Sequence, residues 1–149
     1  MTILAQNKGI TTQYTILETY QAGVALLGHE VKSARAGKAT LKGSYIKLYG
    51  DEAFWVGGVI AAYQNGPLYK DYKQDRPRKL LLARKELSRL IGRSQEKGLT
   101  LVPISLYTKG PWIKLELAVA RGLKKFDKRQ KLKERDFQRR KAKLEGRSF

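Results

Sequence analysis

The sequence predicts a mainly β fold, a small and mostly antiparallel barrel with two or three helices packed on it. Three observations lead to this class. About six short segments have the polarity alternation or the β-branched composition that is typical of strands. Helical patterns are few, and they do not alternate regularly with strands as in parallel α/β folds. The length of 149 residues suits one domain plus a tail.

The first half of the chain is predicted to be rich in strands. We expect a flexible N-terminus over residues 1–12, followed by the barrel domain over 13–122. Composition and alternation predict strands over 13–20, 24–27, 44–49 and 53–63, with turns over 21–23 and 50–52. A short helix is expected over 30–36, because Gly37 follows as a C-terminal stop. The pair Gly57-Gly58 predicts a bend or bulge in the last of these strands.

The second half begins with a long polar loop over 65–77. A helix is predicted over about 83–96, because Leu87, Leu90 and Ile91 form one apolar face at helical spacing. Strands are predicted over 99–108 and 112–120, joined by a turn. Pro103 marks a bulge or an edge in the first of them.

Charge and composition narrow the function classes. The formal net charge is +18, which favours a polyanionic partner, RNA or DNA first and an anionic membrane second. No apolar run approaches the roughly 18 residues that span a bilayer, and the N-terminus does not read as a secretory signal. The absence of cysteine excludes disulfides, thiolate metal sites and thiol nucleophiles. We therefore expect a cytoplasmic protein without a membrane association.

Residue types that carry catalysis are sparse. The single histidine, His29, has no cysteine and no obvious aspartate partner nearby in the sequence, and Glu30 stands alone among basic residues. No glycine-rich phosphate loop is present, and a nuclease would need clustered acids for metal ions. We expect no catalytic residue, no metal site and no cofactor.

Basic residues form two clusters in the domain. Lys32 and Arg35 share a face of the predicted helix and Lys38 lies just past its end, so the row can follow a phosphate backbone or be an ordinary solvated face. The second cluster, at the exit of the long loop, contains Arg76, Arg78 and Lys79. Tyrosines 63, 69 and 72, in or beside this loop, can stack on unpaired bases or anchor the loop on the core.

The C-terminal tail carries the densest charge. Residues 121–149 hold 13 Lys or Arg against 4 Asp or Glu, which is half of the excess charge of the chain. Their few apolar residues cannot offset an ordering entropy of roughly 1–2 kcal/mol per residue. We expect the tail, residues 123–149, to be disordered when free and helical once a polyanion neutralises it, with Asp127 as a helix cap. The alternative is a flexible, non-specific basic arm.

Four blocks of the chain resemble one known family, the bacterial SsrA-binding proteins, also called small protein B. The resemblance covers roughly residues 7–140. Its blocks are Gly28-His29-Glu30-Val31-Lys32-Ser33 with its continuation to Tyr45, Arg78-Lys79-Leu80-Leu81-Leu82, Lys97 to Tyr107, and Leu115 to Gly122 running into Asp127-Lys128-Arg129 and Lys133-Glu134-Arg135-Asp136.

The resemblance implies an oligonucleotide-binding type of barrel that binds the tRNA-like part of transfer-messenger RNA. It also implies rescue of stalled ribosomes by trans-translation, with the tail in the decoding centre and the empty mRNA channel. Resemblance and charge together give these RNA-binding candidates: Asn7, Glu30, Lys32, Arg35, Lys38, Arg76, Arg78, Lys79 and Leu80. The ribosome-binding candidates in the tail are Lys124, Lys125, Asp127, Lys128, Arg129, Lys131, Lys133 and Arg135.

The chain departs from the family pattern at two places. Residues 9–13 replace a basic stretch that usually ends in His, and Lys73-Gln74 replaces a common Asp-Pro. We expect a monomeric, non-enzymatic adaptor with transfer-messenger RNA and the ribosome as partners. The rival interpretation is a basic ribosomal protein with an rRNA-threading tail.

Overall fold

The structure, a computed structural model, describes residues 1–63, 71–123, 135 and 139. Within these residues the chain forms nine strands and three helices. The strands are β1 (Thr2–Gln6), β2 (Tyr14–Val24), β3 (Ala39–Thr40), β4 (Tyr45–Tyr49), β5 (Glu52–Val56), β6 (Val59–Ile60), β7 (Arg78–Leu81), β8 (Leu99–Lys109) and β9 (Trp112–Gly122). The helices are α1 (Ile10–Gln13), α2 (Gly28–Arg35) and α3 (Arg84–Ser94). None of the described helices is long and apolar enough to cross a membrane.

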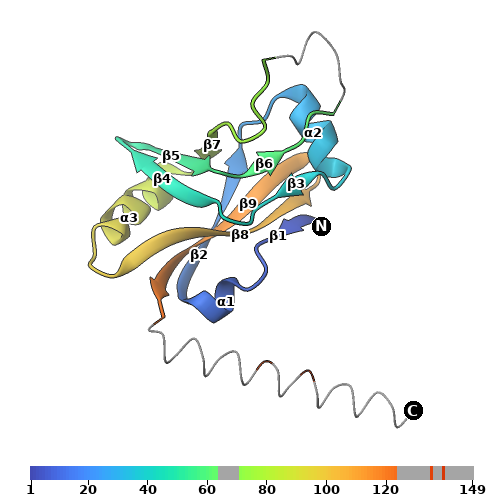
Figure 1. Cartoon of the computed structure of the whole chain (residues 1–149). Helices are drawn as coiled ribbons and strands as arrows, with labels where there is room; N and C mark the ends of the chain where they lie inside the picture. The colour runs from blue at the N-terminus through green and yellow to red at the C-terminus, as the bar shows by residue number, and fades with distance from the viewer. Residues whose placement is uncertain (64–70, 124–134, 136–138, 140–149) are drawn as a thin grey trace.

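One antiparallel sheet of seven strands forms most of the molecule, in the order β1-β8-β9-β2-β7-β5-β4. The sheet curls until β4, at one end of the order, lies against the first residues of β8 (Figure 1). No backbone pairing joins β4 to β8 among the strands that the structure describes, so the barrel is partly open. The mainly antiparallel β fold is confirmed, whereas the oligonucleotide-binding type of barrel stays a prediction.

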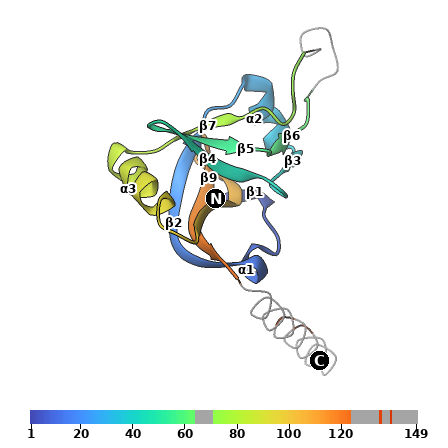
Figure 2. The ribbon, with the colours of Figure 1, turned by 60° about the vertical axis from the view of Figure 1, so that its left-hand side comes forward.

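Helices and a small second sheet complete the domain. The strands β3 and β6 pair separately beside α2, while α3 lies at the other end of the β4–β5 ribbon (Figure 2). The prediction of α3 over 83–96 is confirmed, and its Leu90 is fully buried as the apolar face required. The strand β9 also alternates as predicted, because Ile113, Leu115 and Leu117 face the core.

The N-terminal segment differs from expectation. Residues 1–12 were expected to be flexible, but Thr2–Gln6 pairs with β8 and Ile10–Gln13 forms the short helix α1. Ile10 packs on a small second core around Val102, Ala118 and Ala120, on the face of β8 and β9 away from the barrel interior. This strand contains Ile3, Leu4 and Ala5, but it is short and only partly buried.

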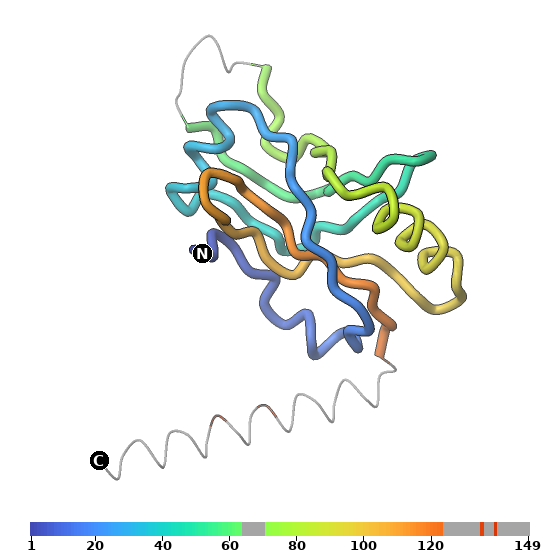
Figure 3. The backbone as a smooth tube through the Cα atoms, turned by 180° about the vertical axis from the view of Figure 1, so that it is seen from behind, coloured from blue at the N-terminus to red at the C-terminus, as the bar shows by residue number. Residues whose placement is uncertain are grey.

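The turn predicted over 21–23 is also wrong. The strand β2 runs unbroken from Tyr14 to Val24 across the back of the molecule (Figure 3), and its residues 21–23 stay paired with β9. Gly23 lies close to the neighbouring strand, because an added Cβ would lie 3.3 Å from the Cβ of Leu81, which is a tight contact. A glycine in a strand therefore marked a close approach of two strands rather than a turn.

The two bulge predictions are confirmed. The chain breaks between β5 and β6 at Gly57, whose φ of 82° lies in the left-handed region that favours glycine. The pairing of β8 with β9 shifts register between Pro103 and Ser105. At Gly57 the chain leaves the large sheet for the small β3–β6 sheet, whereas the bulge at Pro103 bends β8 within the large sheet.

The core is centred on Trp55, the largest fully buried side chain. Its indole lies so close to Gly58 that an added Cβ would come within 2.0 Å of the ring. The Gly57-Gly58 pair therefore serves two purposes: one residue bends the chain and the other makes room for the indole.

We expect Gly58→Ala to destabilise the domain by about 1–3 kcal/mol or more, because neither the indole nor the chain can move away freely. Gly92→Ala is the matched control: Gly92 is exposed on α3 with nothing within 4 Å of an added Cβ. That change should stabilise the domain by about 0.5–1 kcal/mol through helix propensity. Urea unfolding of both variants checks this, and equal midpoints for the two would contradict it.

Candidate nucleic-acid interface

The helix α2 begins with a backbone amide held by an acidic side chain. The Glu30 carboxylate accepts a hydrogen bond of 2.8 Å from the amide of Leu27, the residue before the helix. This satisfies one of the free amides at a helix start, and the negative charge suits the positive end of the helix dipole. The helix ends where Gly37 adopts a φ of 80°, as predicted.

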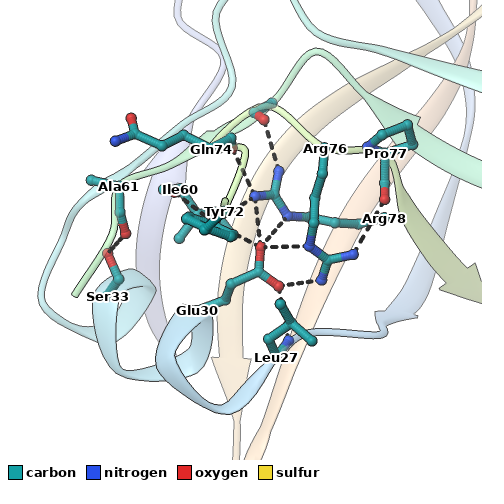
Figure 4. A network of polar contacts seen from close by, with 11 residues as sticks. Leu27, Glu30, Ser33, Ile60, Ala61, Tyr72, Gln74, Arg76, Pro77 and Arg78 are labelled. Atoms are coloured by element: carbon teal, nitrogen blue, oxygen red, sulfur yellow. Dashed lines mark hydrogen bonds and ion pairs between the residues drawn. The ribbon is translucent and has the colours of Figure 1, made fainter. Parts of the chain in front are cut away.

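The same carboxylate is fully buried between two arginines (Figure 4). Arg78 donates to it from Nε at 2.9 Å and from Nη2 at 2.7 Å. Arg76 donates from Nε at 3.1 Å and from Nη2. Arg76 spans both carboxylate oxygens with its fork, which is the geometry of the strongest charge-assisted pairs, whereas both Arg78 donors bind the same oxygen, Oε2. We call this set, Glu30, Tyr72, Arg76 and Arg78, the Glu30 cluster.

Arg78 also donates hydrogen bonds to other groups inside the protein. Its Nη1 donates to the Gly58 carbonyl at 2.7 Å and its Nη2 to the Gln74 carbonyl at 2.8 Å. Its guanidinium also lies over the Trp55 ring, 5.3 Å from the centroid, a cation–π distance. The side chain is fully buried, so its charge is compensated entirely by these neighbours.

Tyr72 closes the cluster from the loop. Its hydroxyl lies 2.8 Å from both the Glu30 carboxylate and the Ile60 carbonyl, and it accepts from Arg78 at 3.1 Å. The rings of Tyr72 and His29 pack edge to face, with 4.5 Å between their centroids. Of the two alternatives for this tyrosine, the structure therefore shows the loop anchor. Tyr69 lies outside the described residues.

The electrostatics of the cluster favour the charged form of Glu30. Burial raises the pKa of Glu30, but hydrogen bonds from Arg76, the Leu27 amide, Arg78 and Tyr72 outweigh burial and lower it to about 2. The carboxylate is therefore ionised throughout the neutral range, and one acid with two arginines leaves the cluster with one net positive charge.

The cluster joins α2 to three other parts of the chain. Two hydrogen bonds strengthen this joint between α2 and the other three segments. The Ser33 hydroxyl donates to the Ala61 carbonyl at 2.6 Å, and the Ala61 amide donates to the Lys38 carbonyl at 3.1 Å. The backbone after β6, the loop over 71–77 and β7 are thus fixed relative to the helix. Sequence reasoning did not bring Glu30 together with Arg76 and Arg78. The sequence signal that could have indicated this pairing is Glu30 itself, a lone acid within a long basic stretch.

The basic row on α2 remains at the surface. Lys32, Arg35 and Lys38 are all exposed, and the Nζ of Lys32 lies 6.0 Å from the centroid of the Tyr63 ring. Arg35 donates to the Pro111 carbonyl at 3.2 Å, which places the β8–β9 turn beside the end of α2. The predicted row on one helix face is therefore present and accessible.

The second predicted cluster is divided between surface and interior. Lys79 is exposed and lies 3.4 Å from Glu52, and Arg76 keeps 28% of its side chain accessible. Glu30, Arg78 and Leu80 are buried in this structure, so RNA contact through these three side chains stays a prediction. For Glu30 and Arg78, such contact would require the cluster to open.

Asn7 lies apart from the Glu30 cluster. Its side-chain amide donates to the Pro103 carbonyl at 2.9 Å, and its backbone amide donates to Ile104 at 2.8 Å. It therefore satisfies the carbonyls that the bulge of β8 leaves unpaired. It also lines a hollow of about 440 Å³ with Lys8 and Lys42, so RNA binding by Asn7 stays a prediction.

The tail candidates lie outside the described residues, apart from Arg135. Arg135 and Arg139, four residues apart, both have helical backbone. The boundary predicted after residue 122 coincides with the end of β9. Among the described residues, no group of three or more acidic or histidine side chains is placed to hold a metal ion. The expectations of no cofactor and no catalysis stay predictions.

Replacing the buried acid should change stability and its pH dependence. The pKa of Glu30 falls from 4.5 to about 2 on folding, so its ionised form stabilises the protein above pH 4.5. This stabilisation, about 3 kcal/mol, is lost as the pH falls from 4.5 towards 2. Glu30→Gln should remove that pH dependence and cost about 3–5 kcal/mol at pH 7, because two buried or half-buried arginines lose their partner.

Urea unfolding across this pH range measures both effects. The control is Glu52→Gln, which removes an exposed partner of Lys79 and should change stability by no more than about 1 kcal/mol. An unchanged acid dependence in Glu30→Gln would show that the carboxylate is not held in its charged form by the cluster.

Comparison with known proteins places this arrangement in a family. The sequence model of the family described as SmpB protein matches residues 4–146. The SsrA-binding protein of Magnetococcus marinus is 46% identical over 142 residues, which cover 95% of this chain and 94% of the relative. The SsrA-binding protein of Oleidesulfovibrio alaskensis is 47% identical over 137 residues, 92% of this chain and 88% of the relative.

A solved structure agrees with these sequences. One of its chains superposes with a TM-score of 0.66 at 44% identity, covering 80% of this chain and 84% of that chain. That structure is described as "tmRNA-SmpB: a journey to the center of the bacterial ribosome". With its fold, its basic helix row and these relatives taken together, the chain belongs to the SmpB family, the SsrA-binding proteins.

Proposed function

We propose that this chain binds transfer-messenger RNA and acts with it in trans-translation on the bacterial ribosome. The observation that carries this proposal is the family match across residues 4–146 together with the related chain solved in a tmRNA–SmpB structure. The tRNA-like part of the RNA is the expected target of the folded body. The protein would then work in the cytoplasm, as a monomer and without catalysis.

The physical basis of RNA binding lies in how the domain arranges its charge. The Glu30 cluster holds α2 and the loop over 71–77 in one orientation, and the basic row of Lys32, Arg35 and Lys38 is displayed on that support. No carboxylate in the described part of the chain forms an ion pair with these three side chains. Their charges are therefore available to RNA phosphates.

The surrounding exposed surface extends this row. Arg76 keeps part of its guanidinium accessible beside Glu30, and Arg35 reaches the β8–β9 turn. Phosphate contacts of this kind position an RNA without reading its sequence, so specificity must come from the shape of a folded RNA. A structured, tRNA-like element satisfies that requirement.

The tail supplies a second and separate site in this proposal. It begins directly after β9, where the Leu123 amide donates to Gln13 at 3.0 Å. Its candidates from Lys124 to Arg135 would enter the decoding centre and the empty mRNA channel, with Asp127-Lys128-Arg129 near the entrance. The density of positive charge suits a channel with RNA walls.

A basic ribosomal protein remains the second candidate, because a barrel with a basic tail also suits rRNA. The two candidates differ in whether the protein stays bound to ribosomes after a high-salt wash. A ribosomal protein stays with ribosomes in stoichiometric amount, whereas the adaptor proposed here leaves them and enriches one structured RNA in a pull-down. The family match favours the adaptor.

Truncation after Gly122 tests the division of labour between body and tail. The body should still bind transfer-messenger RNA, because its basic row and the Glu30 cluster are intact, whereas tagging on stalled ribosomes should be lost. Filter binding and a reconstituted tagging assay measure the two activities. Loss of RNA binding together with the tail would contradict the proposal.

A further inference from the structure

The strand β4 presents an ordered row of side chains that neither the core nor the Glu30 cluster uses. Tyr45, Lys47 and Tyr49 occupy alternate positions and point outward, while Ile46 is buried between them. The two tyrosines are 48% and 72% exposed. Alternate residues of a strand are about 6.8 Å apart, so the row presents an aromatic ring, a cation and a second ring in sequence.

The neighbouring strand supports this row. On β5 the residues opposite are Val56 beside Tyr45 and Phe54 beside Lys47, both partly buried, and Glu52 beside Tyr49. The charge of Glu52 is compensated by Lys79 at 3.4 Å. On this face of the β4–β5 ribbon the side chains are therefore aromatic, apolar or basic, except for Glu52 at the end next to the turn.

Hollows continue from the row across the open seam of the barrel. Tyr45 lines a hollow of about 400 Å³ between β4 and the first residues of β8, together with Lys47. It also lines the hollow of about 440 Å³ that contains Lys8 and Lys42. The ring at the start of β4 thus connects the exposed strand face with two further cations.

We propose that the outer face of β4 binds a single-stranded RNA segment, with unpaired bases stacked on Tyr45 and Tyr49. A phosphate between the bases lies at Lys47, and the strand continues past Tyr45 towards Lys42 and Lys8. This inference rests on the proposed function only in that the polyanion is an RNA. The segment is distinct from the structured RNA that the row on α2 is proposed to bind.

The chemistry of the face favours RNA over a protein partner. Aromatic rings that alternate with lysine match the alternation of bases and phosphates, and such platforms bind single strands without sequence preference. A protein would be expected to bury an apolar centre, but the centre of this row is the exposed Lys47. Stacking needs only the faces of the rings, so the tyrosine hydroxyls have no required role.

The test uses the full-length protein and a short fluorescein-labelled oligouridylate, with binding followed by anisotropy at several salt concentrations. Tyr45→Ala/Tyr49→Ala should weaken binding by about 5-fold or more for each stack that is lost, at every salt concentration. Tyr45→Phe/Tyr49→Phe should bind like the wild type. Lys47→Gln should instead reduce the slope of log affinity against log salt by about 0.7.

The matched control is Trp112→Ala, which removes an aromatic side chain, 68% exposed, from β9 and should leave oligouridylate binding unchanged. A bromouridine-containing oligouridylate should crosslink to Tyr45 or Tyr49 on irradiation. The inference is overturned if the alanine pair binds like the wild type or if Trp112→Ala weakens binding equally. It is also overturned if crosslinks form only at other residues, which is the result expected if β4 binds a protein and not RNA.

Binding of transfer-messenger RNA is measured on the same proteins to separate the two proposals. If the wild type binds transfer-messenger RNA while the alanine pair leaves oligouridylate binding unchanged, only the role of β4 fails. If the wild type does not bind transfer-messenger RNA, the proposed function fails, whatever the oligouridylate does.

Discussion

The buried ion cluster around Glu30 is the constraint on which the arrangement of this domain depends. Moving charges out of water costs several kcal/mol per ion, and the cost is offset only when nearly every donor and acceptor is satisfied. Here the carboxylate accepts from two guanidinium groups and the Leu27 amide, and Arg78 also reaches Gly58 and Gln74. Because these partners come from α2, the loop over 71–77, β7 and the bend before β6, all four segments must be in place together.

This constraint determines where part of the excess positive charge is displayed on the surface. A net charge of +18 attracts any polyanion, but attraction alone does not orient an RNA. The cluster fixes the helix that carries Lys32, Arg35 and Lys38, and the glycine pair at 57–58 lets the Trp55 ring lie beneath Arg78. The row on α2 and the outer face of β4 then form two differently built surfaces on one barrel, one suited to folded RNA and one to unpaired bases.

Segments with a regular polarity pattern, or with a proline or glycine that marks a bulge, could be predicted from the sequence. The helix α3, the alternating strand β9 and the bulge at Pro103 followed from local patterns, and the family followed from the order and spacing of four sequence blocks. Contacts between distant residues could not be predicted. Arg78 carries the same charge whether it meets a phosphate or a buried carboxylate 48 positions away. Gly23 looked like a turn because nothing local shows that Leu81 packs against it.

Amide hydrogen exchange in Glu30→Gln is the most direct test of this account, measured at neutral pH with Glu52→Gln as the control. The informative probes are the Ile60 amide, which donates to Gln74 at 3.0 Å, and the amides of α2. The account predicts that these probes lose more protection than the amides of β8 and β9, because the joint opens locally. Equal losses in all these segments, or unchanged protection at Ile60 and α2, would contradict the claim that Glu30 holds them together.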